Sequence, residues 1–246
     1  MKLVLLGTGG YYPNDRRHTA CLMLPEMGVV LDAGSGMYRV RDHLATDHLD
    51  IFLSHVHLDH VVGLTYLLDV LPPDTLARCT VHAEAAKLAA LREHLFAEAI
   101  FPVLPPFRLE PLREKHALPQ AGTLTHFPLK HPGGVRGFRL DWPDRSMAYV
   151  TDTTAASDAD YVQKIRGVDL LVHEAYFAED EGDLPAVTGH SCLAQVAHVA
   201  AAAQVGRLVL VHIHPQLQED DELNLDAVRR AFQNTQIGTD RMELEF

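Results

Sequence analysis

The segment from Leu49 to Leu68, LDIFLSHVHLDHVVGLTYLL, places four potential metal ligands within six positions. These ligands are His55, His57, Asp59 and His60. The apolar run before them, 51–53, is short enough for a buried strand, and the apolar run after them, 61–68, can begin a helix. A loop between a strand and a helix is held by two rigid elements, which suits a metal site.

The spacing within this segment indicates two metal ions. His55 and His57 are two positions apart, so they project to the same side of an extended backbone. Asp59 and His60 are adjacent, so they diverge and can reach a second position. Four ligands this close do not easily surround one tetrahedral zinc, but they can serve two ions roughly 3.5–4 Å apart. Such a pair needs further ligands, including a bridging carboxylate.

Three polar residues at the ends of apolar strands are candidates for the missing ligands. His131 follows FPLK, Asp152 ends the apolar run MAYVT, and His212 ends RLVLV. Binding residues collect at strand ends in open α/β sheets. Together with the first cluster they predict a metal centre assembled from both halves of the chain.

Composition is typical of an ordinary soluble globular protein, with 47% apolar and 22% charged residues. No apolar run reaches the roughly 18 residues of a membrane helix, and the N-terminal residues lack the features of a signal peptide. We therefore expect a cytoplasmic protein. Cys21, Cys79 and Cys192 are widely separated, which argues against disulfides and thiolate zinc sites and favours buried thiols.

The net charge of −12 disfavours a long polyanion as partner, because an acidic surface repels nucleic acid. Two bound divalent cations would offset about four of these charges locally. A small phosphate-bearing substrate therefore remains compatible with the charge. The chain also holds 16 histidines, which makes metal or proton chemistry worth testing.

Strand-like stretches alternate with helix-like stretches in both halves, which predicts an α/β (α+β) sandwich in a single domain, residues 1–246. The expected strands cover 2–6, 19–25, 28–32, 51–53, 79–82, several segments within 107–150, 168–174 and 207–212. The expected helices cover 37–44, 64–71, 83–99, 190–204 and 226–232. The glycines of 7–10 predict a tight turn beside the site, because no helix follows them as a dinucleotide site requires.

The motif HVHLDH at 55–60 matches the HxHxDH signature of the metallo-β-lactamase superfamily, and the resemblance extends over nearly the whole chain. It implies a four-layered αββα sandwich with the site at one edge, between the sheets. It also implies two divalent ions, with zinc as first choice and manganese or iron as alternatives. The implied ligands are His55, His57 and His131 for the first ion, Asp59, His60 and His212 for the second, and Asp152 as the bridge.

Within this superfamily the chain resembles the ribonuclease Z and cyclic-nucleotide phosphodiesterase branch. The N-terminal VLLGTGGYYPNDRRHTACLML, AYVTDT at 148–153, VHEAYF at 172–177 and Gly189-His190-Ser191 carry this resemblance. Two positions depart from it, since Leu58 replaces a usual Gly and Tyr176 replaces the Thr of the HEAT segment. Residues 155–170 are too short for the tRNA-gripping arm of ribonuclease Z. The small phosphodiesterases of phosphonate breakdown are a second resemblance, and a homodimer is expected from the resemblance alone.

The resemblance implies a phosphodiesterase that cleaves a small or cyclic phosphodiester with a metal-bridging hydroxide. Asp59 would bind metal and orient the hydroxide or accept its proton. His190 would protonate the leaving group as general acid, and Glu174 would fix its tautomer. The alternative for His190 is a helix N-terminus capped by Ser191. Asp32 is predicted to accept a hydrogen bond from a ligand histidine, with a strand-end turn as alternative.

Other functions remain open at this point: a ribonuclease Z-type tRNA 3′-end endonuclease, an ester, thioester or lactone hydrolase, a redox di-iron protein, and a metal-stabilised binding module. Arg16, Arg17 and His18 either contact substrate phosphate or lie in a solvated loop, and the solvated loop is preferred. His173 and His214 are interpreted as structural residues.

Overall fold

The computed structural model describes residues 1–71, 77–178, 182–217 and 225–246. The first seven strands in chain order are β1 (Lys2–Gly7), β2 (Cys21–Leu24), β3 (Val29–Leu31), β4 (His48–Phe52), β5 (Arg78–Ala83), β6 (Arg108–Pro111) and β7 (Lys115–Leu118). The other strands are β8 (Gly122–Leu129), β9 (Val135–Asp141), β10 (Ser146–Val150), β11 (Leu170–Glu174), β12 (Arg207–Val211), β13 (Thr235–Ile237) and β14 (Glu243–Glu245).

The helices are short and lie mainly between strands. The α-helices are α1 (Val40–His43), α2 (Leu58–Val61), α3 (Leu67–Val70), α4 (Ala85–Ala90), α5 (Asp160–Lys164), α6 (Leu184–Thr188), α7 (Leu193–Ala203) and α8 (Leu225–Ala231). The 3₁₀ and π turns are η1 (Pro25–Met27), η2 (Ser35–Arg39), η3 (Val62–Tyr66) and η4 (Leu91–Leu95). Among the described helices none is long and apolar enough to cross a membrane.

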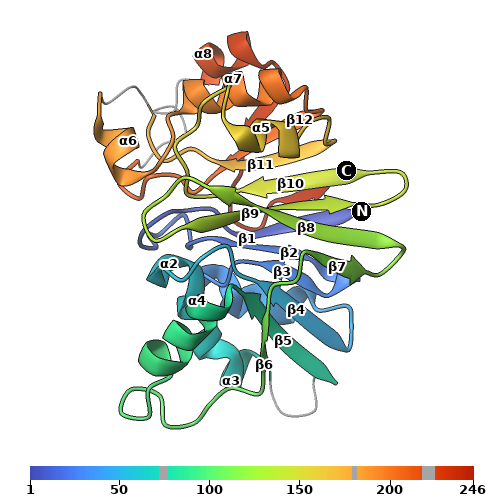
Figure 1. Cartoon of the computed structure of the whole chain (residues 1–246), viewed down its shortest axis with the longest axis vertical. Coiled ribbons are helices and arrows are strands. Elements are labelled where there is room, and N and C mark those ends of the chain that lie inside the picture. Colours follow the sequence, from blue (N-terminus) through green and yellow to red (C-terminus); the bar gives the residue numbers. More distant parts are fainter. Residues whose placement is uncertain (72–76, 179–181, 218–224) are drawn as a thin grey trace.

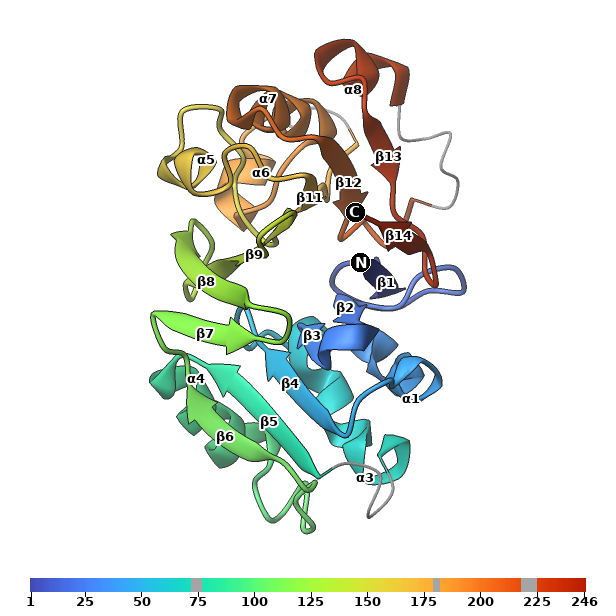
Figure 2. The same cartoon turned by 90° about the vertical axis from the view of Figure 1, so that its right-hand side faces the viewer.

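The described strands form two seven-stranded sheets packed face to face, with helices on both outer faces (Figures 1 and 2). The first sheet has the order β14-β1-β2-β3-β4-β5-β6, and the second has the order β13-β12-β11-β10-β9-β8-β7. Helices α2, α3 and α4 cover the first sheet, and α5, α7 and α8 cover the second (Figure 1). This arrangement is the predicted four-layered αββα sandwich.

The sheets are held by three apolar cores, one between each pair of neighbouring layers. Strand side chains alternate between two of these cores because successive residues point to opposite faces. In β1, Leu3 and Leu5 enter the core between the sheets, whereas Val4 and Leu6 face the helices. The central core extends from Leu3 to Leu244. This core joins strands from both ends of the described chain, while the single domain over 1–246 stays a prediction.

Several predicted elements differ from the structure. The expected helix over 83–99 is wrong in length, because α4 passes into a π turn over 91–95 and then ends. It ends where Phe96 turns inward, with its ring 5.2 Å from Phe101 and 5.4 Å from Phe107. The expected helix over 190–204 begins later, at Leu193. Strands β13 and β14 and helices α5 and α6 were not predicted.

The loop after β1 is fixed by Asp240, from the segment before β14. Asp240 Oδ1 accepts hydrogen bonds from the N–H and the hydroxyl of Thr8, at 3.0 and 2.8 Å. Its Oδ2 accepts the His18 N–H at 2.8 Å and pairs with Arg39 Nη1 at 2.6 Å. The side chains of Arg39 and Asp240 are only 9% and 6% exposed, so this ion pair is buried. One carboxylate therefore joins both ends of the loop.

Asp240→Asn should lower the free energy of unfolding by roughly 3 kcal/mol, because it leaves the Arg39 charge buried without its partner. Denaturant unfolding followed by circular dichroism measures this change. Replacement of the exposed Asp158 by Asn is the control and should change stability by less than about 0.5 kcal/mol. Equal stability of Asp240→Asn and the control would contradict the proposed weight of this ion pair.

A cluster of histidines lies between the edges of the two sheets. The His116 ring lies 4.8 Å from that of His82 and 5.0 Å from that of Phe52. The Arg113 N–H donates to His116 Nε2 at 3.0 Å, which requires a free lone pair on that nitrogen. Burial, together with the nearby charges of His82, Arg113 and His126, lowers the pKa of His116 to about 4.

This lowered pKa predicts acid sensitivity. The neutral form of His116 is favoured in the folded state, so its contribution to stability is complete above pH 6.5 and is lost as the pH falls from 6.5 towards 4. His116→Gln should reduce the acid-induced loss of unfolding free energy by roughly 1 kcal/mol. The effect is no larger because solvent screens this half-exposed position. Urea unfolding of metal-free protein at pH 7 and pH 4.5 measures it. His198→Gln, at an exposed position, should behave like wild type.

Candidate metal centre and catalytic site

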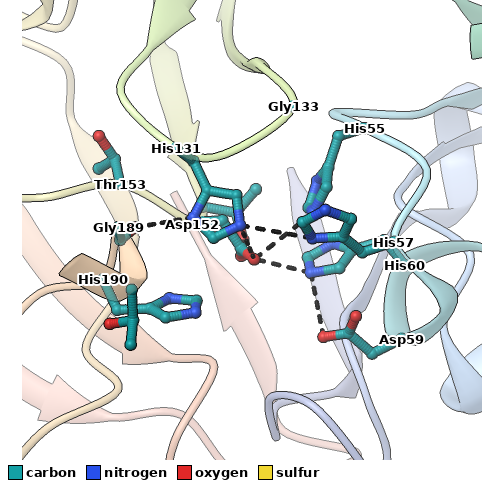
Figure 3. Close-up of polar contacts among 12 residues, drawn as sticks. His55, His57, Asp59, His60, His131, Gly133, Asp152, Thr153, Gly189 and His190 are labelled. Atoms are coloured by element: carbon teal, nitrogen blue, oxygen red, sulfur yellow. Dashed lines mark hydrogen bonds and ion pairs between the residues drawn. The ribbon is translucent and has the colours of Figure 1, made fainter. Parts of the chain in front are cut away.

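The candidate site lies at one end of both sheets, where parallel strands terminate. β3, β4 and β5 run parallel in the first sheet, and β10, β11 and β12 run parallel in the second. Asp32 follows β3, the HVHLDH loop follows β4, Asp152 follows β10, and His212 follows β12. Parallel strands end at the same edge, which brings residues from 32 to 212 together. Figure 3 shows six of the seven predicted ligands converging from both halves of the chain: His55, His57, Asp59, His60, His131 and Asp152.

The carboxylate of Asp152 stands between two groups of ligand atoms. Its Oδ2 lies 3.5 Å from His55 Nε2 and 3.7 Å from His131 Nε2. Its Oδ1 lies 3.3 Å from both His60 Nε2 and His212 Nε2. In the first group His57 Nδ1 lies 3.4 Å from His131 Nε2. Each carboxylate oxygen thus faces a different set of histidines, as expected for a bridging ligand.

The second group is completed by Asp59. Its Oδ2 lies 3.3 Å from both His60 Nε2 and His212 Nε2, and these two nitrogens are 3.2 Å apart. Donor atoms roughly 2.0–2.1 Å from a tetrahedral zinc lie about 3.3–3.4 Å from one another. The observed separations of 3.2–3.7 Å are close to that spacing. Both groups therefore have the size to hold one ion each.

Hydrogen bonds on the far side of three rings direct their Nε2 atoms into the site. His131 Nδ1 donates to the Gly189 carbonyl at 2.9 Å, since a carbonyl can only accept. His60 Nδ1 donates to Asp32 Oδ2 at 2.9 Å, and His55 Nδ1 lies 2.9 Å from Ser54 Oγ. In the neutral form of each ring, Nε2 keeps its lone pair. His55 Nε2 is buried without a hydrogen-bond partner, which a bound cation would resolve.

Asp32 organises this outer layer and is fully buried. Besides His60, it accepts hydrogen bonds from the N–H and hydroxyl of Ser54, at 2.7 and 2.9 Å, and from the Tyr149 hydroxyl at 3.0 Å. The predicted hydrogen bond from a ligand histidine to Asp32 is therefore present. Partners of this kind fix ring orientation and raise the basicity of the ligand.

Backbone strain is concentrated around the site. Among the described residues, four of the eight non-glycine residues with positive φ lie here: Tyr11 at 63°, Asp32 at 57°, Asp152 at 34° and His212 at 57°. Such conformations cost about 1–3 kcal/mol each and persist only where the surroundings impose them. Gly10 allows close approach, since a Cβ there would lie 2.5 Å from the His212 ring.

In the metal-free site, the histidines of the two ligand groups differ in the direction of their pKa shifts. Burial lowers the pKa values of His55, His57 and His131. Burial alone would also lower the pKa of His60, but the carboxylates of Asp152 and Asp59 raise it well above its ordinary value. The histidines in turn hold the pKa of Asp152 well below its usual range despite burial. Two buried carboxylates thus draw positive charge to the site, from protons or from metal ions.

His190 and Glu174 lie beside the second group. Glu174 is fully buried, and its two oxygens accept the N–H groups of Thr153 and Tyr176, at 3.1 and 3.0 Å. Its Oε1 lies 3.4 Å from His190 Nδ1, a distance for an ion pair and longer than a good hydrogen bond. Tyr176 stacks on the His190 ring with centroids 4.6 Å apart and planes at 21°.

The alternative in which Ser191 caps a helix is wrong. Helix α7 is capped by Cys192 and begins at Leu193. Ser191 instead donates to the Thr153 carbonyl at 2.5 Å and accepts the Ala155 N–H at 3.0 Å. It therefore ties the segment before α7 to the segment after Asp152.

The remaining candidates have structural places. The preferred solvated-loop interpretation is wrong for Arg17, which is buried and donates to the Thr8 hydroxyl and the Gly238 carbonyl. Arg16 is exposed and His18 is half-buried. His173 is buried and accepts the Tyr161 hydroxyl at 3.0 Å, and the His214 ring packs 4.5 Å from that of Tyr176. Buried free thiols are confirmed for the three cysteines, Cys21, Cys79 and Cys192.

Sequence reasoning missed several contributors to the site. Ser54 and Tyr149 support the ligand histidines through Asp32, and the Tyr11 N–H donates to Asp59 Oδ2 at 3.0 Å. The Gly189 carbonyl orients His131. Alternation along β10 indicates that Tyr149 is on the inner face. Contacts made by backbone groups cannot be predicted from residue types.

A cavity of about 220 Å³ opens over the site. Its lining residues are Tyr11, His57, Asp59, Asp152, Tyr176, Thr188, His190 and His212. Four predicted ligands, His57, Asp59, Asp152 and His212, therefore face the same space as His190. The structure places all nine predicted site residues at this end of the sandwich, while their individual roles stay predictions.

Comparison with known proteins agrees with this geometry. The family described as Beta-lactamase superfamily domain matches residues 28–213. A ribonuclease Z from Metallosphaera sedula is 27% identical, covering 94% of each chain. The solved metallo-beta-lactamase fold protein YhfI from Bacillus subtilis superposes with a TM-score of 0.82 at 17% identity, over 100% of this chain and 99% of that one. A diphosphatase of the PhnP family superposes with a TM-score of 0.74 at 21% identity, over 100% and 97%.

The chain belongs to the beta-lactamase superfamily, in its metallo-β-lactamase fold group. The predicted resemblance to the ribonuclease Z and phosphodiesterase branch is confirmed, as are the fold and the assignment to metal-dependent hydrolases. The His and Asp clusters fit divalent metal ions, while the number and identity of the ions stay predictions.

Asp32→Asn should weaken metal binding by roughly 10–100-fold, because Asn cannot accept hydrogen bonds from His60, Ser54 and Tyr149 as a carboxylate does. Competition between metal-free protein and a chromophoric zinc chelator measures the affinity. Asp50→Asn is the matched control, since Asp50 also pairs with a histidine, His82 Nε2 at 3.0 Å, but outside the site. Equal zinc affinity of Asp32→Asn and wild type would contradict the supporting role.

Proposed function

We propose that this protein is a dinuclear metal-dependent phosphodiesterase that cleaves a small or cyclic phosphodiester. The observation that carries the proposal is the joint placement of two donor groups and the His190–Glu174 pair around one cavity. Hydrolases of esters with good leaving groups need the metal ligands alone. An added acid suits a reaction whose leaving group is an alkoxide, which requires a proton.

The size of the cavity favours a small substrate. Its volume of about 220 Å³ lies below the roughly 300–1,000 Å³ of common ligand pockets, so it suits a phosphate and one adjoining group. The net charge of −12 disfavours a long polyanion. Residues 155–170 include helix α5, and Tyr161, Val162 and Ile165 of this segment pack into the outer core. This segment is therefore no substrate-gripping arm.

The proposed ligands are those implied by the family pattern. His55, His57 and His131 would hold one ion, Asp59, His60 and His212 the other, and Asp152 would contact both. Divalent ions at these positions would polarise the phosphoryl oxygens and generate a nucleophile from water at neutral pH. Zinc is our first choice, with manganese or iron as alternatives.

The protein's own groups would position and move protons around the phosphate. Asp59, held by the Tyr11 N–H, would orient the attacking water and accept its proton. His190 would donate a proton to the departing oxygen. Glu174, fixed by two backbone N–H groups, faces His190 Nδ1 and would stabilise the imidazolium before the transfer. The stacked ring of Tyr176 holds the imidazole in its plane.

The second candidate is a tRNA 3′-end endonuclease, which the ribonuclease Z relatives favour. Incubation of metal-loaded protein with a precursor tRNA transcript, beside bis(p-nitrophenyl) phosphate and alkyl diesters, separates the two. Turnover of the small diesters without cleavage of the transcript supports the phosphodiesterase. Cleavage of the transcript at its 3′ trailer would favour the endonuclease. Dimerisation, expected from the family resemblance, is measured on the same sample by light scattering.

His190→Ala should lower kcat for an alkyl phosphodiester by roughly 10²–10⁴-fold, because the alkoxide then departs without a proton. Turnover of bis(p-nitrophenyl) phosphate should fall only a few-fold, since p-nitrophenolate leaves unprotonated. Steady-state kinetics on both substrates measures the contrast.

The same variant distinguishes an acid from a structural residue or from an ester hydrolase site. A structural loss would lower both rates equally, and an ester, thioester or lactone hydrolase would be little affected. His198→Ala, on the exposed face of α7, is the control and should match wild type on both substrates.

A further inference from the structure

Two tyrosines, Tyr11 and Tyr176, line the cavity, and their rings differ in their contacts. Tyr176 is half-buried and packs between two imidazoles, with its centroid 4.6 Å from His190 and 4.5 Å from His214. Its ring is therefore already covered. Tyr11 is 72% exposed although it also lines the cavity. Within the described part of the chain its recorded ring contact is with Tyr12, edge-on at 5.7 Å and 62°.

The position of Tyr11 is fixed by its backbone. Its N–H donates to Asp59 Oδ2 at 3.0 Å, so the residue is tied directly to a proposed metal ligand. The neighbouring Gly10 N–H donates to the Ile213 carbonyl at 3.0 Å, and the Tyr12 N–H donates to the Gly10 carbonyl at 2.8 Å. The φ of 63° is rare for a residue with a large side chain. The backbone thus holds an exposed aromatic side chain beside the proposed metal centre.

The loop beyond Tyr12 is equally fixed. Asn14 Nδ2 donates to the Pro215 carbonyl at 2.8 Å, and Asn14 Oδ1 accepts the N–H groups of Arg16 and Arg17. Asp240 anchors the loop at Thr8 and His18. A ring on such a loop loses little freedom when a planar group stacks on it. Neither its packing nor its hydrogen bonds give the Tyr11 ring a role in the fold.

We propose that Tyr11 is a specificity-determining residue whose ring stacks on a planar aromatic group, a nucleobase or an aryl ring, attached next to the scissile phosphate. The inference rests on the proposed phosphodiesterase function and adds the chemical class of the group beside the phosphorus. Tyr12 contacts the Tyr11 ring in a T-shaped arrangement, with centroids 5.7 Å apart. Stacking on a tyrosine tolerates any base because every base offers a flat face. The site would therefore recognise the presence of an aromatic ring and would not distinguish one base from another.

The test compares two substrates with the same reacting atoms. Metal-loaded protein is assayed with adenosine 2′,3′-cyclic phosphate and with methyl ribofuranoside 2,3-cyclic phosphate, which lacks the base. Wild type should prefer the nucleotide in kcat/KM by roughly 5- to 150-fold, mainly through KM. Tyr11→Ala and Tyr11→Leu should reduce this ratio to about one, because Leu restores apolar bulk without a flat ring. Tyr11→Phe should keep the preference.

A binding measurement separates this inference from the proposed function. Calorimetric titration with adenosine 5′-monophosphate and with ribose 5-phosphate reports ring recognition without hydrolysis. Tighter binding of the nucleotide that Tyr11→Ala abolishes and Tyr11→Phe retains supports the inference, even if neither cyclic diester is cleaved and the phosphodiesterase proposal fails. Cleavage of both diesters with equal kcat/KM, or a preference unchanged in Tyr11→Ala, overturns the inference and leaves the phosphodiesterase proposal standing.

Discussion

The buried carboxylate of Asp152 is the constraint on which the rest of the site depends. Removing a carboxylate from water is costly unless opposite charge and hydrogen bonds replace the solvent. Here four histidines from three segments, those after β4, β8 and β12, point their nitrogens at its two oxygens, at 3.3–3.7 Å. The ends of β4, β8, β10 and β12 must therefore meet at one point, which fixes how the two sheets face each other.

The residues around the predicted ligands hold the candidate metal centre in place. Strained backbone at Asp32, Asp152 and His212 is maintained because each residue follows the buried end of a strand. Asp32 then links both sheets, since it accepts hydrogen bonds from Ser54 after β4 and from Tyr149 on β10. The apolar core between the sheets and the polar network above it are thus joined through one side chain.

Sequence reasoning could predict the features that residue type and period encode. Alternating and apolar runs indicated most strands, and polar residues at strand ends indicated His131, Asp152 and His212. Contacts made by backbone groups were beyond it, including the Gly189 carbonyl and the Tyr11 N–H. The short β13 and β14 were missed because three residues carry too little pattern. The burial of Arg17 was missed because one of its two partners, the Gly238 carbonyl, lies 221 residues away in the sequence. The other partner is the Thr8 hydroxyl.

The role of Asp240 has a consequence for the order in which the site can form during synthesis. The loop that carries Tyr11 begins near the N-terminus, yet it is anchored by a carboxylate 232 residues after Thr8. His212 also leaves the ribosome late. The nascent chain therefore exposes the HVHLDH loop long before its partners exist, and a complete ligand cage can close only after translation has passed residue 240. The proposed metal centre can therefore be complete only when the sandwich is complete.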